Sequence, residues 1–154
     1  METRYTWKTK FFSNTIRIYQ YEGQVGEIAN KAFSRAATGE LNGRKLLFDI
    51  KGFFRQETRI LDARDESIVA DVIISSWKSK ATITYNNREY IWQHENFWNS
   101  KWSISNENGA VVKYHSRGNG GEVTSYTNDE VLILAGLFIK NYFKQRAAAA
   151  AAST

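Results

Sequence analysis

The feature that most constrains the fold is an unbroken apolar run near the C-terminus, residues 131–139, with the sequence VLILAGLFI. Just before it, Thr127 and Glu130 have the spacing of a capping box, in which a hydroxyl and a carboxylate satisfy backbone N–H groups at a helix start. Basic residues follow the run at Lys140, Lys144 and Arg146. Acidic charge before the run and basic charge after it both complement a helix dipole, so the run predicts a helix.

A helix wound from this run has no polar side. At 100° per residue, Val131 and its three successors point in four directions, and a helix that is apolar all round must be buried all round. A membrane span requires about 20 predominantly apolar residues. Even residues 131–143 fall short of that length, and they include Lys140 and Asn141. We therefore expect burial inside protein and no transmembrane span. A tail-anchored membrane protein is an alternative that would require this helix to span.

Composition narrows the class of protein. The 154-residue chain has the length of one domain, and it contains no cysteine, which excludes disulfides and thiolate chemistry. Residues 1–10 lack the apolar core of a secretory signal, so we expect a cytoplasmic protein that can lie peripherally at a membrane. The net charge of +5 permits weak attraction to anionic partners. Because Lys and Arg are scattered rather than clustered, the charge predicts a solvated surface and no nucleic-acid partner.

Short strand-like segments separated by turn residues precede the helix. Alternating apolar residues and β-branched runs predict strands over residues 3–12, 14–21, 24–33, 44–50, 53–61, 68–74, 80–93 (a hairpin), 101–105, 110–115 and 122–126. Residues 38–43 are predicted to be a polar connection. In the hairpin, Asn86 and Asn87 suit a tight turn with positive φ, which pairs Ile83 with Tyr90 and turns Trp92 inward. Such a series of short strands predicts an antiparallel barrel or sandwich.

The successive strand–acidic–turn–strand units, such as residues 102–112, and the closing helix that begins Asp129-Glu130-Val131, resemble the tubby-like superfamily. That superfamily includes tubby C-terminal domains, LURP-one-related proteins and phospholipid scramblases. The resemblance implies a closed antiparallel β-barrel of about 12 strands that encloses a hydrophobic C-terminal helix. On this basis we expect a single domain over residues 1–146, with the central helix at 129–146. An Ala-rich tail, 147–154, can extend the helix. The resemblance also implies contact with phospholipid headgroups or membranes.

The densest aromatic cluster comprises Trp92, Phe97, Trp98 and Trp102, with Lys101 beside it. Strand phase assigns Trp92 and Trp102 to the core. Phe97 and Trp98 fall in a predicted loop and are the best surface candidates, because aromatic and basic groups together suit a membrane interface. Lys78 and Lys80 are predicted to share a face of the strand that enters the Asn86-Asn87 hairpin. The predicted lipid-headgroup or partner-binding residues are Lys78, Lys80, Phe97, Trp98 and Lys101.

Other motifs favour structural roles. His94 and His115 have no metal-ligand partner at helical or turn spacing. The acidic segment 62–67 lacks the ligand pattern of a calcium loop and reads better as a hairpin tip. The glycine-rich segment 118–121 lacks the spacing of a phosphate loop and is predicted to be a flexible turn. We therefore expect no catalytic residues, no metal and no cofactor.

Two functions compete at this stage. The first is a non-enzymatic intracellular domain that binds an anionic phospholipid headgroup or a protein partner through its outer surface. The alternative is a lipocalin-like carrier of an apolar small molecule, with the helix packed outside the barrel. An outside helix requires an amphipathic stripe, which residues 131–139 lack. The sequence leaves the oligomeric state open.

Overall fold

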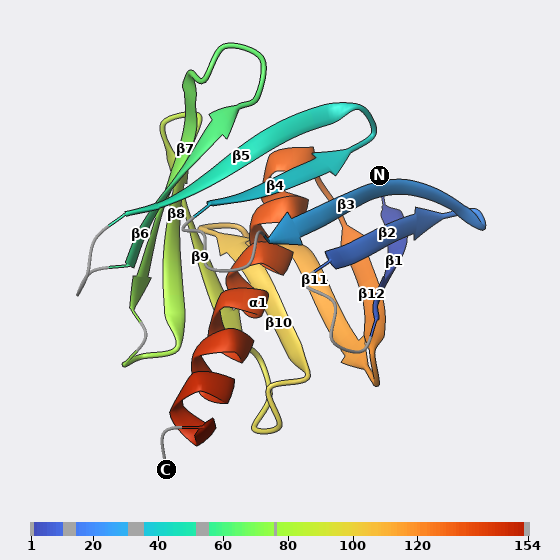
Figure 1. The fold of residues 1–154 in the computed structure, drawn as a ribbon, viewed down its shortest axis with the longest axis vertical. Coiled ribbons are helices and arrows are strands. Elements are labelled where there is room, and N and C mark those ends of the chain that lie inside the picture. Colours follow the sequence, from blue (N-terminus) through green and yellow to red (C-terminus); the bar gives the residue numbers. More distant parts are fainter. Residues whose placement is uncertain (1, 11–14, 31–35, 52–55, 76, 153–154) are drawn as a thin grey trace.

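The computed structural model describes residues 2–10, 15–30, 36–51, 56–75 and 77–152, and it consists of a closed barrel of twelve antiparallel strands followed by one helix (Figure 1). Each strand pairs with its neighbours in the chain, and β1 closes the barrel by pairing with β12. The predicted fold class is confirmed. The strands are β1 (Thr3–Thr9), β2 (Thr15–Gln20), β3 (Gly23–Asn30), β4 (Ala36–Leu41), β5 (Arg44–Lys51), β6 (Gln56–Asp62), β7 (Ile68–Ser75), β8 (Lys80–Tyr85), β9 (Arg88–His94), β10 (Lys101–Asn106), β11 (Gly109–Arg117) and β12 (Gly120–Ser125).

The β8–β9 hairpin has the predicted register. Ile83 pairs with Tyr90, and Ala81 pairs with Trp92. Asn86 and Asn87 both have positive φ, at 53° and 59°, as a tight hairpin turn requires. The paired apolar side chains are buried, because alternate residues of a strand point to the same face.

Strand β4 lies where the sequence predicted a connection, so that prediction is wrong. The signal was weak because Ala, Gly and Glu have low strand propensity. Gly39 of this strand leaves space for the ring of Phe48, because a Cβ atom at position 39 would lie only 2.7 Å from Cε2 of that ring. The Phe48 ring in turn stacks on Phe138 of the helix, with ring centroids 4.5 Å apart.

The glycine-rich turn is shorter than predicted for a similar reason. Gly120 and Gly121 belong to β12 and pair with Lys8 and Trp7 of β1. A Cβ atom on Gly121 would overlap the indole ring of Trp7. The predicted strand ends at Phe12, Asn14, Phe33 and Phe53 lie outside the described residues.

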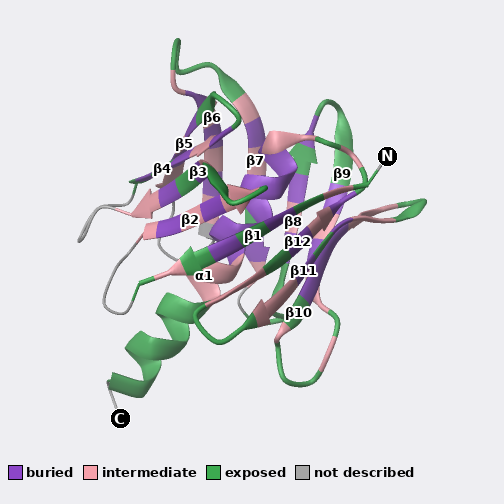
Figure 2. Ribbon diagram, turned by 90° about the vertical axis from the view of Figure 1, so that its right-hand side faces the viewer, coloured by how far each residue is buried: buried purple, intermediate pink, exposed green. Residues whose placement is uncertain are grey.

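Helix α1 (Glu130–Ala152) runs through the barrel and leaves by one end (Figure 1). Residues 131–139 are all buried, 140–143 are partly buried, and 144–152 are exposed beyond the barrel (Figure 2). The predicted helix is confirmed, and the alanine tract continues it to Ala152. Its interior position contradicts the alternative in which the helix packs outside. Within the described ranges, no helix combines the length and the hydrophobicity that crossing a bilayer requires.

The helix start differs in detail from the predicted capping box. Asp129 is the cap, because its Oδ1 accepts a hydrogen bond from the backbone N–H of Val131 at 3.0 Å. Thr127 instead accepts a bond from the N–H of Asp129 at 2.9 Å and so forms the turn before the helix. Asn128, with φ of 55°, turns the chain between these two residues. The capping box is therefore wrong, although the predicted position of the helix start holds within one residue.

Two polar side chains of the barrel wall fix the helix in place. The hydroxyl of Tyr114 donates to the carbonyl oxygens of Leu132 and Ile133, at 3.1 and 2.9 Å, and Trp92 Nε1 donates to the carbonyl of Gly136 at 3.1 Å. Gly136 permits this approach, because a Cβ atom there would overlap the Tyr114 hydroxyl. Complete burial raises the pKa of Tyr114 well above its usual value, so the phenol remains a neutral donor.

Candidate docking end of the barrel

The end of the barrel through which α1 leaves is called the exit end here. In a barrel of sequential antiparallel strands, alternate connections lie at the same end. The β7–β8, β9–β10 and β11–β12 connections therefore all lie at the exit end (Figure 1). A groove connects the first two of these connections to the helix, since Ser79, Asn99 and Lys144 all line it. The exit end thus gathers residues that are far apart in the sequence.

Among the residues that the structure describes, three large aromatic side chains project from the exit end. Trp77 in the β7–β8 turn is 90% exposed, and Phe97 and Trp98 in the β9–β10 connection are 88% and 79% exposed. The rings of Phe97 and Trp98 meet edge to face, with centroids 5.3 Å apart. Trp92 and Trp102 of the same sequence cluster are fully buried. The cluster is therefore divided between core and surface, and its surface part lies at the same end of the barrel as Trp77.

Charge is distributed unequally between the two ends. At the exit end, the described residues that connect or terminate strands include basic Lys10, Lys51, Lys78, Lys80, Lys101 and Arg117, against acidic Glu95. The emerging helix adds Lys140, Lys144 and Arg146. At the opposite end, the corresponding residues include acidic Glu22, Asp62, Asp65, Glu66, Glu107 and Asp129, against basic Arg44, Arg64 and Arg88. The barrel therefore presents a basic exit end and a mainly acidic opposite end.

The structure brings all five predicted binding residues to the exit end. Lys80 and Lys101 are the first residues of β8 and β10, and Phe97 and Trp98 lie in the connection that precedes β10. Lys78 lies in the β7–β8 turn, so the prediction that it shares a strand face with Lys80 is wrong. The reason is Ser79, whose positive φ of 52° breaks the strand between them.

Sequence reasoning missed several residues of this end. Trp77 was missed because it lies only three residues after Ile74, the last β-branched residue of β7, where it resembles a continuation of that strand. Its position beside Lys78 was the available signal. Lys144 and Arg146 carry no sequence signal beyond that of basic residues near a helix C-terminus. Only the threading of the helix through the barrel brings them beside the strand connections.

Lys140 ties the helix to the β9–β10 connection. Its Nζ donates to the backbone oxygen of Asn99 at 2.7 Å and lies 3.1 Å from Nε2 of His94. It also lies over the ring of Trp102, 5.1 Å from the ring centroid. Among the described residues, no carboxylate forms an ion pair with this ammonium. Neutral acceptors and a π face therefore hold a partly buried cation.

Burial lowers the pKa values of both His94 and Lys140. Burial, and then the neighbouring charge of Lys140, lowers the pKa of His94 to about 4, so the imidazole is neutral at pH 7. Burial, and then repulsion by Lys144, lowers the pKa of Lys140 to about 8. Lys140 is therefore mainly protonated at pH 7. In this state Lys140 donates the bond and His94 accepts it.

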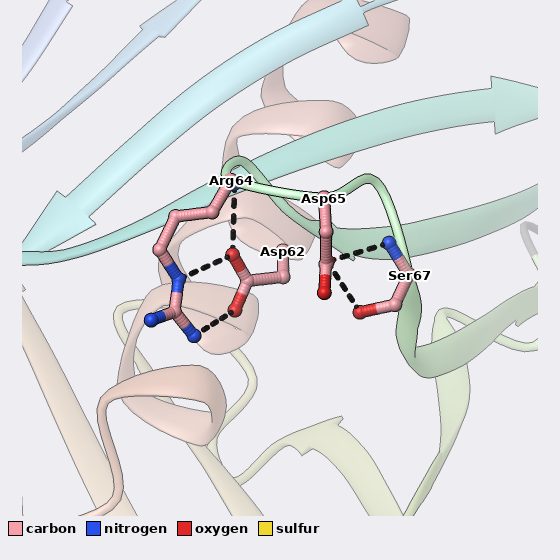
Figure 3. Close-up of polar contacts among 4 residues, drawn as sticks. All are labelled: Asp62, Arg64, Asp65 and Ser67. Atoms are coloured by element: carbon pink, nitrogen blue, oxygen red, sulfur yellow. Dashed lines mark hydrogen bonds and ion pairs between the residues drawn. The ribbon is translucent and has the colours of Figure 1, made fainter.

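At the opposite end, the acidic β6–β7 tip is closed by its own side chains (Figure 3). Asp62 accepts bonds from the backbone and the guanidinium of Arg64, at 2.9–3.2 Å, and this partner lowers the pKa of the Asp62 carboxyl. Asp65 accepts bonds from the backbone and the hydroxyl of Ser67, at 3.0 and 2.7 Å. These bonds engage both carboxylates within the turn. The geometry is that of a side-chain-stabilised hairpin tip.

Comparison of the chain with protein-family models, with curated proteins and with solved structures finds no match. The geometry of the exit end is therefore the basis for a functional proposal.

Proposed function

We propose that this protein is a non-enzymatic tubby-like domain that binds anionic phospholipid surfaces through its exit end. The observation that carries the proposal is the coincidence of three exposed aromatic rings with an excess of lysine at one end of the barrel. The closed barrel with a threaded helix is the architecture that the tubby-like resemblance implies, and it supports the proposal. Because fold alone does not fix function, the exposed residues of the exit end are the basis of the proposal.

The charge asymmetry favours one orientation at a membrane. Each Lys or Arg close to an anionic leaflet contributes about 1 kcal/mol of attraction, and this attraction decays within a Debye length of roughly 10 Å. The exit end therefore approaches such a surface, and the mainly acidic opposite end is repelled. The protein diffuses to the bilayer with its exit end foremost.

The exposed aromatic side chains add apolar contacts with the bilayer to the electrostatic attraction. Trp and other aromatic side chains favour the interfacial region of a bilayer, where an apolar ring is buried and a polar edge stays hydrated. Trp77 projects from one turn, and Phe97 and Trp98 project from another. Rings that project from separate turns insert into a fluid interface without needing a matching contour. This favours a lipid surface over a protein partner.

The test is co-sedimentation with vesicles of phosphatidylcholine alone or with about 30% phosphatidylserine, at roughly 50 and 300 mM salt. We expect binding to the anionic vesicles at low salt and weaker binding at high salt, because screening shortens the range of the attraction. Replacing Lys78, Lys80 and Lys101 together by Gln removes about 3 kcal/mol if the three contributions add, which is a loss of roughly 100-fold. Replacing Trp77, Phe97 and Trp98 by Ser should weaken the binding that persists at high salt.

The matched control lies at the opposite end. Arg44, Lys45 and Arg88 are exposed there, and their replacement by Gln removes the same net charge. This control should retain more binding than the exit-end variant. No binding of the unaltered protein at low salt, or equal losses in both variants, would exclude the proposed surface.

A further inference from the structure

A cavity of about 150 Å³ lies beside the helix at the exit end, between α1 and strands β1, β2, β10 and β11. Its walls include the apolar side chains of Trp7, Ile16, Trp102 and Leu137. Its polar lining includes Lys140 and Lys144. Its volume is below the roughly 300–1,000 Å³ of drug-sized ligand sites, so it suits a fragment-sized molecule.

The electrostatics of this cavity select an anion. Lys140 and Lys144 both line it, and neither forms an ion pair with a described carboxylate. No Asp or Glu is among the described residues that line it. A partly buried cation without a counter-charge is costly, and an anionic ligand that enters beside it removes part of that cost.

Trp102 is a reporter of this cavity. It lines the cavity together with the two lysines and is 1% exposed. Its indole Nε1 is closed to solvent and has no hydrogen-bond acceptor among the described residues. A ligand in the cavity would therefore lie against the Trp102 ring and change the surroundings of its indole N–H.

We infer that this cavity is a binding site for a small organic carboxylate with an apolar body. The carboxylate lies toward Lys140 and Lys144, and the apolar body packs against Trp7 and Leu137. A carboxylate fits better than a phosphate dianion, because Lys140 already donates to Asn99 and contacts His94, and the polar side chains of the lining other than the two lysines are uncharged. Lys140 and Lys144 also contribute charge to the exit end, but the aromatic and lysine side chains tested for lipid binding do not line this cavity, and ligand binding is measured without membranes.

The test uses 3-phenylpropionate as the probe and its neutral amide as the matched control. In ¹H–¹⁵N spectra of the unaltered protein, the Trp102 indole resonance should shift saturably with 3-phenylpropionate. For a ligand of this size, the expected Kd is roughly 0.1–5 mM. The amide should bind at least about 5-fold more weakly. Equal binding of the two probes, or no saturable shift of this resonance, overturns the proposal.

Variants test the assignment of the lysines. Lys144→Met, at an exposed position, should weaken the carboxylate about 3-fold or more, and Lys140→Met about 10-fold. Lys113→Met removes an equal charge from the exposed outer face of β11 and should leave the affinity unchanged. Because Lys140→Met also removes a helix contact, its spectrum and melting temperature are compared with those of the unaltered protein. Tighter binding of phenyl phosphate than of the carboxylate, or an equal effect of Lys113→Met, contradicts the inference.

Discussion

Replacing Gly136 by Ala tests whether the helix is enclosed, because the two possible surroundings give effects of opposite sign. In an exposed helix interior, Gly→Ala stabilises by about 1 kcal/mol. Inside this barrel the new methyl group overlaps the hydroxyl and ring of Tyr114. That ring cannot easily retreat, because it stacks on Trp102 with centroids 5.3 Å apart and an interplanar angle of 6°.

The expected magnitude follows from the groups that must move. Overpacking a well-packed core costs about 1–3 kcal/mol. Displacing Tyr114 leaves its hydroxyl without its acceptors on Leu132 and Ile133, which costs about 1–3 kcal/mol more. After subtraction of the gain in helix propensity, we expect Gly136→Ala to lower the free energy of unfolding by about 1–5 kcal/mol.

Urea denaturation, analysed by linear extrapolation, measures this change. Ala148→Gly, in the exposed part of α1, is the control and should cost at most about 1 kcal/mol, the difference in helix propensity alone, because that segment has no barrel contacts to lose. Tyr114→Phe should cost about 1 kcal/mol, and it should relieve Gly136→Ala only in part, because ring carbons also lie within the overlap. Stabilisation by Gly136→Ala would refute the enclosed helix.

Three further predictions concern other parts of the fold. Gly39→Ala should destabilise by about 1–3 kcal/mol, measured by urea denaturation, because the new Cβ meets the Phe48 ring; an unchanged midpoint would show that this ring is not fixed. Asp129→Ala should lower the free energy of unfolding by about 0.5–2 kcal/mol through loss of the helix cap, whereas Thr127→Ala should lower it less. A larger loss for Thr127→Ala would support the predicted capping box instead. The pKa of His94 is about 4 in the folded protein and about 6.5 when unfolded, so the unfolded chain binds the proton more readily. The contribution of neutral His94 to the free energy of unfolding is complete above pH 6.5. It is lost as the pH falls toward 4, by about 1–2 kcal/mol after allowance for solvent screening. His94→Gln should reduce the slope of the unfolding free energy against pH between pH 4 and 6.5, measured by urea denaturation at several pH values. An unchanged slope would contradict the lowered pKa of His94.

Much of the fold could be predicted because two sequence signals were strong. The unbroken apolar run predicts a buried helix and the Asn86-Asn87 pair predicts a tight hairpin turn, and the structure contains both. Strand β4 was missed because its role depends on Phe48, a neighbour in space. A glycine that makes room for a ring on another strand looks the same in sequence as a glycine that forms a turn. Local propensity therefore failed where a tertiary contact decided the outcome.

The exit end was only partly predictable. Phe97 and Trp98 stood out because they fall between strands, where large aromatic residues are unexpected. The contact of Lys140 with His94 joins residues 46 positions apart and depends on the threading of the helix. Nothing in the local sequence of either residue signals the other.

Collisional accessibility of a spin label on vesicle-bound protein tests the proposed orientation most directly. The chain has no cysteine, so Ser79→Cys at the exit end and Asn108→Cys at the opposite end each provide a single labelling site. On anionic vesicles, we predict that the label at 79 loses contact with a water-soluble relaxant and gains contact with oxygen, while the label at 108 stays fully hydrated. A label at 108 that becomes protected, or one at 79 that stays hydrated on bound protein, would contradict docking through the exit end.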